Sequence, residues 1–138
     1  MGIKDIKNIL EFCDARCQWL IETTTALVQI ESPTANKVAV DRCGFELARQ
    51  LKTLGAAVDD IESETTGNHL RATFGKGPAQ ILLLGHFDTV WPLGQIEQMP
   101  IRRQDSRLYG PGVFDMKAGI VIGMLALSAL KELGLSLT

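Results

Sequence analysis

A run of apolar residues, Ile81 to Leu84, leads through Gly85 into His86 and constrains the fold more than any other feature of the sequence. A continuous apolar run of this length is typical of a β-strand that is covered on both faces. The sequence therefore predicts a strand over residues 80–85 inside a layered α/β domain. Open α/β sheets bind their ligands just beyond the carboxyl ends of such strands.

Three residues able to ligate a metal ion or transfer protons lie in and after this region: His86, Asp88 and Asp115. Because His86 and Asp88 are two positions apart, they are expected to project on the same side of the chain. Asp115 follows a loop rich in proline and glycine and opens a predicted helix. A histidine and two carboxylates at the ends of regular elements are typical of metal-assisted hydrolysis.

Each of these residues also has an ordinary structural interpretation. A single histidine is often a hydrogen-bonded core residue, and this interpretation is preferred for His69, which has no carboxylate at a recognisable spacing. Asp115 is equally suited to capping the helix that follows it. Trp91 and Pro92 either wall the site or pack under the loop, and neither is expected to take part in catalysis.

The first half of the chain is predicted to be helical. Apolar residues recur at helical spacing over residues 4–30, which indicates one long helix or two helices in line. A second helix is predicted between Asn36, a suitable N-cap, and Gly55, a suitable C-terminal stop. The residues between these two helices include Pro33, which ends the first one.

The second half mixes strands with one more helix. Residues 56–62 and 69–74 have strand character. Residues 117–133 form a predicted helix so apolar that a sheet or other helices must cover it. The order of helices, strands and a final helix predicts a layered α/β fold.

Composition narrows the possible functions. The 138 residues suit one domain, 46% of them are hydrophobic, and the net charge is −2 without a polybasic run. Nucleic acid and anionic membrane surfaces are therefore not expected partners. No apolar run approaches the roughly 18–20 residues of a membrane-spanning helix. The opening residues lack the apolar core of a signal peptide, and the three cysteines form no CxxC pair, so a cytoplasmic location without disulfides is expected.

Two segments taken together, GHFDTVWP and LYGPGVFDMKAG, resemble the zinc-dependent exopeptidase and amidohydrolase family. That family includes glutamate carboxypeptidases, acetylornithine deacetylase, succinyl-diaminopimelate desuccinylase and aminoacylase. The segment IESPTANKVAVDRCGFELARQLKTLG also resembles a stretch of the family. The resemblance covers most of the chain between Leu20 and Leu133, and the glutamate carboxypeptidase branch is the most similar.

The resemblance implies a role for each candidate site residue. His86 would bind one metal ion, Asp115 would bridge two, and Asp88 would be the catalytic acidic residue that orients the imidazole. It implies zinc, two ions per complete site, with cobalt or manganese as substitutes, and a small peptide or N-acyl amino acid as substrate. It also implies a cis peptide bond at Asp115-Met116 and a fold equivalent to the N-terminal portion of a three-layer αβα catalytic domain with an incomplete sheet.

The sequence also departs from the family pattern. The family uses a Glu-Glu pair, a further acidic ligand, a C-terminal histidine and an inserted lid or dimerisation domain, and none of these is found in residues 1–138. These residues are therefore expected to be the N-terminal part of the catalytic domain and to be inactive alone. The alternative is a non-catalytic piece that needs a complementary chain. Uncovered sheet edges and an apolar final helix predict self-association in either case.

Overall fold

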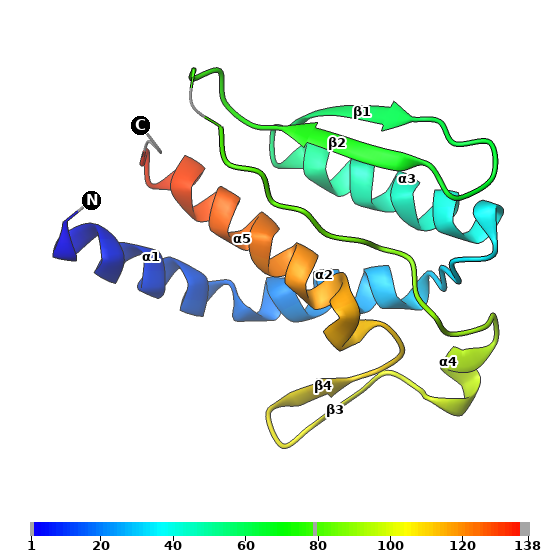
Figure 1. Cartoon of the computed structure of the whole chain (residues 1–138). Helices are drawn as coiled ribbons and strands as arrows, with labels where there is room; N and C mark the ends of the chain where they lie inside the picture. Colours follow the sequence, from blue (N-terminus) through cyan, green and yellow to red (C-terminus); the bar gives the residue numbers. More distant parts are fainter. Residues whose placement is uncertain (1, 79, 136–138) are drawn as a thin grey trace.

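A computed structural model describes residues 2–78 and 80–135 (Figure 1). The elements in chain order are α1 (Ile3–Ala15), α2 (Cys17–Gln29), α3 (Lys37–Thr53), β1 (Ala57–Ile61), β2 (His69–Thr73), α4 (Gln95–Gln98), β3 (Arg102–Gln104), β4 (Arg107–Tyr109), a π-helical turn (Val113–Lys117) and α5 (Ala118–Glu132). Helices and small sheets are mixed along the chain, as the α/β prediction required.

Helices α1 and α2 lie almost in line along one side of the molecule (Figure 1). The break between them falls at Arg16, where the backbone leaves the helical region. Of the two predicted possibilities for residues 4–30, two helices in line is therefore correct. The β-branched residues Thr23 to Thr25 remain helical, and Thr24 is buried in the interface that α2 forms with the rest of the chain.

Helix α3 begins and ends where the sequence predicts. The Asn36 side-chain oxygen accepts a hydrogen bond of 3.0 Å from the backbone N–H of Ala39. Gly55 follows the last turn with φ of +97°, a left-handed conformation that glycine adopts without steric cost. The N-cap and the stop of this helix are thus both confirmed.

The strands form two separate antiparallel hairpins. Strands β1 and β2 pair from Ala57–Thr73 to Ile61–His69 and pack on α3. Strands β3 and β4 pair around a two-residue turn in which Asp105 and Ser106 both have positive φ. The sequence predicts a loop here, because the strands of this second hairpin are short and polar and its turn lacks the Asn-Gly or Asp-Gly pair that marks such turns.

The predicted strand over residues 80–85 is not formed. The segment is extended and runs beside α5 without a ladder partner among the described residues (Figure 1). Leu83 faces Gly123 of α5, yet the four apolar residues of the run, Ile81 to Leu84, remain 65–85% exposed. An apolar run favours a strand only where neighbouring strands supply backbone hydrogen bonds. This part of the prediction was wrong because no such neighbours are present in the described chain.

The core lies where α2, α3 and α5 meet. Its buried members are Leu27, Leu47, Leu51, Ala56, Val121 and Met124. Helix α5 turns one apolar side to this core and leaves Ile122 about half exposed. The apolar helix predicted for residues 117–133 is thus confirmed and covered on one side by other helices.

One stretch, Val113–Glu132, is long and apolar enough to pass as a membrane-spanning helix, which the sequence analysis did not anticipate. Length and composition alone are weak evidence, because the core helix of a globular domain passes the same test. Here Asp115 and Met116 interrupt the helical dihedral angles. The inner side of α5 packs in the core.

Removing the N-cap of α3 should measurably destabilise the fold. We expect Asn36→Ala to lower the free energy of unfolding by about 1 kcal/mol, because the Ala39 N–H loses its side-chain acceptor. Urea unfolding followed by circular dichroism measures the change. Arg42→Ala, an exposed substitution within the same helix, is the control. Equal losses for the two variants would contradict the capping assignment.

Candidate metal site

His86 and Asp115, 29 residues apart in the chain, meet at the surface. The His86 Nε2 lies 3.0 Å from the Asp115 Oδ1. The other ring nitrogen, Nδ1, lies 3.2 Å from the backbone oxygen of Asp88 and 3.3 Å from its Oδ1. The structure therefore brings all three candidate residues together, with the imidazole between two acidic residues. Their roles in binding a metal ion remain predictions.

Asp115 occupies an irregular turn in front of α5. The dihedral angles of Asp115 and Met116 are not helical, and the peptide bond between them is cis, as the family resemblance implied. Helix α5 starts at Ala118 without any side-chain cap. The alternative interpretation of Asp115 as a helix cap is therefore wrong, and its carboxylate is 78% exposed beside His86.

The position of Asp88 depends on the segment that follows α2. Thr34 Oγ1 donates a hydrogen bond of 2.6 Å to Asp88 Oδ2. Ser32 Oγ donates one of 2.6 Å to the Phe87 carbonyl. The Thr89 backbone donates to Ser32 O at 2.8 Å and accepts from the Thr34 N–H at 2.9 Å. A parallel bridge between the two segments thus holds the chain just after His86.

The backbone of the loop before Asp115 requires glycine. Gly112 has φ of +76°, and a Cβ built there would lie 2.6 Å from the Thr89 methyl group. Any larger residue would therefore push the turn away from the segment that carries Asp88. Gly112 therefore lets the turn that carries Asp115 lie against Thr89, directly after Asp88.

Lys117, just after the turn, is buried and reaches toward the end of α2. Its side chain is 1% exposed, and its Nζ donates to Leu27 O at 3.0 Å and Ile30 O at 2.8 Å. Burial lowers the pKa of Lys117 below its ordinary value, more strongly than the nearby Cys43, Glu31 and Asp88 raise it. Sequence reasoning missed this residue because it reads as an ordinary first residue of an apolar helix.

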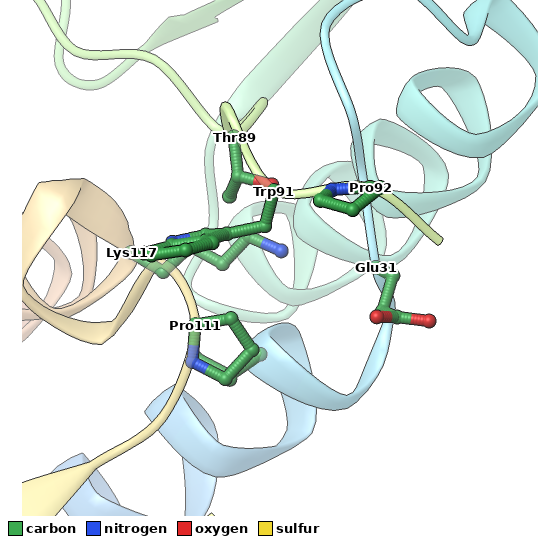
Figure 2. A pocket seen from close by; sticks show the side chains of 7 residues that line it. Glu31, Thr89, Trp91, Pro92, Pro111 and Lys117 are labelled. Carbon is green, nitrogen blue, oxygen red and sulfur yellow. The ribbon is translucent and has the colours of Figure 1, made fainter. Parts of the chain in front are cut away.

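A small hollow lies beside Lys117 (Figure 2). Trp91, Pro92 and Pro111 line it together with Lys117. Glu31 borders the same hollow, and its carboxylate accepts hydrogen bonds from the Gly94 and Ile96 N–H groups at 2.8 and 3.0 Å. The segment after α2 thus also holds the loop that leads to α4.

The electrostatic environment of His86 favours its protonated form. Burial lowers its pKa, but the hydrogen bond to Asp115, the contact with the Asp88 backbone and the two negative charges together outweigh burial. They raise the pKa of His86 above its ordinary value of 6.5. The same negative surroundings would favour a metal cation in place of the proton.

The donor set matches part of a metal site. An imidazole nitrogen and a carboxylate oxygen that face each other are donors that zinc accepts. Among residues 2–78 and 80–135, however, no group of three or more histidine, cysteine or acidic residues is placed to hold one ion. His69, the second histidine, is exposed on β2 rather than in the core and takes no part.

Known proteins similar to this chain share a family. Residues 82–138 match the family model described as Peptidase family M20/M25/M40. The chain is 33% identical over 118 residues to carboxypeptidase G2 of Pseudomonas sp. (strain RS-16), which covers 83% of this chain and 28% of that protein. It is 34% identical over 106 residues to acetylornithine deacetylase of Photorhabdus laumondii, a match that covers 70% of this chain and 28% of that protein.

Further matches extend the pattern. Succinyl-diaminopimelate desuccinylase of Xylella fastidiosa (strain M12) is 33% identical over 89 residues, 61% of this chain and 23% of that protein. The crystal structure of human carnosine dipeptidase 1 has the same fold over 99% of this chain and 33% of its own, with a TM-score of 0.82 and 22% identity. The chain thus spans little more than a quarter of the length of the first curated relatives.

The raised pKa of His86 predicts that the stability of the metal-free protein depends on pH. The protonated imidazole contributes stability that is fully present below about pH 6.5 and is lost as pH rises through the higher folded-state value. Asp115→Asn removes the hydrogen-bonded carboxylate and should lower the pKa of His86, measured by NMR titration with a chelator present. Asp60→Asn, an exposed substitution on β1, should leave it unchanged. An unaltered His86 pKa in Asp115→Asn would contradict the assignment.

Proposed function

We propose that this chain, which contains part of a Peptidase family M20/M25/M40 domain, supplies metal ligands to the active site of a metal-dependent hydrolase. The observation that carries this proposal is the 3.0 Å approach of His86 Nε2 to Asp115 Oδ1 at an exposed position. In the proposed site, His86 and Asp115 are the ligands of the metal ion. Asp88 is the acidic residue that orients the imidazole through Nδ1.

In this proposal activation of the water molecule and the amide comes from the metal, and the protein residues orient the metal ligands. His86 and Asp115 would hold the metal, and zinc bound there would supply Lewis-acid activation of water and of an amide carbonyl. The residues of this chain prepare that site. Asp88 holds the His86 ring through its second nitrogen, and Thr34 in turn holds Asp88. Contacts of this kind set the direction of a ligand ring and raise its basicity.

The names of the relatives support a proposal for the substrate class. Their names describe a carboxypeptidase, a deacetylase and a desuccinylase, all of which are hydrolases. We propose the corresponding substrate here, a small peptide or an N-acyl amino acid, and zinc as the metal. Because no group of three or more histidine, cysteine or acidic residues among the described residues is placed to hold one ion, the 138-residue chain alone is not expected to hydrolyse it.

Zinc binding tests the metal-site proposal directly. We expect the chain to bind zinc weakly and His86→Ala to weaken this binding on the order of 10-fold or more, because one of two ligands is lost. Isothermal titration measures the affinity, in a background with Cys13 and Cys17 changed to serine so that free thiols do not compete. His69→Ala is the matched control. Equal affinities for wild type and His86→Ala would refute the proposal.

A second candidate function rests on a different observation. The apolar residues Ile81 to Leu84 are exposed, and the described residues provide no backbone hydrogen bonds to them. An exposed, extended and uncharged segment is a template for pairing with another strand. We propose that the chain associates through this segment, and that in a purified sample a second copy of the chain is the partner.

Light scattering with size-exclusion chromatography measures this association. We expect the wild-type chain to form dimers or larger species as concentration rises. Introducing charge with Leu82→Lys and Leu84→Lys, both more than 80% exposed, should shift it toward monomer without unfolding it. Val38→Lys, at a similarly exposed apolar position on α3, should leave association unchanged. A monomeric wild-type chain at all concentrations would exclude this second function.

A further inference from the structure

Lys117 is a buried polar residue that the proposed chemistry does not use. It lies two positions after Asp115, yet its ammonium group is directed to the end of α2 rather than to solvent. Burying an amine is unfavourable unless its hydrogen-bonding groups are satisfied. Here two backbone carbonyls accept two of its three N–H donors, so its position needs an explanation other than surface solubility.

The acceptors of Lys117 are at the C-terminal end of a helix. Leu27 O lies in the last turn of α2, and Ile30 is its C-cap residue. The last carbonyls of a helix lack intrahelical partners and carry the negative end of the helix dipole, so a lysine is a favourable partner for them. Lys117 therefore joins the turn that carries Asp115 to the end of α2.

The same segment also holds the other half of the site. Immediately after Ile30 the chain continues through Ser32 and Thr34, which hydrogen-bond the Phe87 carbonyl and the Asp88 carboxylate. The backbone of Thr89 pairs with this segment as well. Residues 27–34 therefore make hydrogen bonds close to both His86 and Asp115. The parallel bridge lies just after His86, and Lys117 follows Asp115 by two positions.

We propose that Lys117 is a positioning residue that holds Asp115 opposite His86 by anchoring its turn to residues 27–34. This inference rests on the proposed metal-site function. The irregular turn has no side-chain cap of its own, and among the described residues the two Lys117 hydrogen bonds connect it to the end of α2. A methionine in its place would fill similar volume but leave both carbonyls without this donor.

The test compares Lys117→Met with a core substitution of comparable cost. Val121→Ala lies one turn further along α5, is fully buried and has no polar role. Both variants are expected to be less stable than wild type, and urea unfolding records by how much. Only Lys117→Met should weaken zinc binding on the order of 10-fold, as the loss of supporting contacts around a metal ligand commonly does.

A metal-free measurement makes the test independent of zinc affinity. The ring ¹⁵N chemical shifts of His86, at fixed pH with a chelator present, report on the hydrogen bond to Asp115. We expect them to move in Lys117→Met and to stay at wild-type values in Val121→Ala. Lys117→Gln keeps an uncharged N–H donor group on a shorter side chain and should recover part of both signals, and it replaces the methionine variant if that variant does not fold.

The outcomes separate the two proposals. If Lys117→Met matches Val121→Ala in zinc affinity and in ring shifts, Lys117 is a structural residue and the positioning role is wrong. If wild type binds zinc no better than His86→Ala, the metal-site function fails. In that case the ring shifts still decide whether Lys117 positions Asp115.

Discussion

The hydrogen bonds between residues 27–34 and the two halves of the site are the interaction on which the arrangement depends. Ser32 and Thr34 hold the chain at Phe87 and Asp88, and Lys117 ties the Asp115 turn to the last carbonyls of α2. These contacts join positions separated by more than 50 residues. Local helix and strand propensities alone do not create such proximity. The end of α2 and the residues after it are the part of the chain that hydrogen-bonds to both halves of the candidate site.

The elements around this segment differ in how deeply they are buried. Helices α2, α3 and α5 share a buried core, whereas the extended apolar run from Ile81 to Leu84 is largely exposed. The family match and the similarity to carnosine dipeptidase 1 confirm the resemblance inferred from the sequence and the partial α/β fold. The chain spans about a third of that structure.

Much of the secondary structure followed from local sequence. The Asn36 cap, the Gly55 stop, the strand character of residues 56–62 and 69–74 and the apolar last helix are all encoded by nearby residues, and each is confirmed. The strand over residues 80–85 was wrong, because strand formation depends on partners elsewhere in the chain. The β3–β4 hairpin was missed, because its short polar strands carry no alternation and its Asp-Ser turn carries a weak signature.

By itself the sequence determined which residues are candidates for the site and which family the chain resembles. His86, Asp88 and Asp115 stand in segments whose residue types and order are specific enough to read without a structure. Only the tertiary structure decided that Asp115 faces His86 rather than capping α5 and that Lys117 is buried against α2. The physical reason is that side-chain types and their spacing are properties of the sequence itself. Which distant carbonyls and carboxylates meet is settled only when the helices pack.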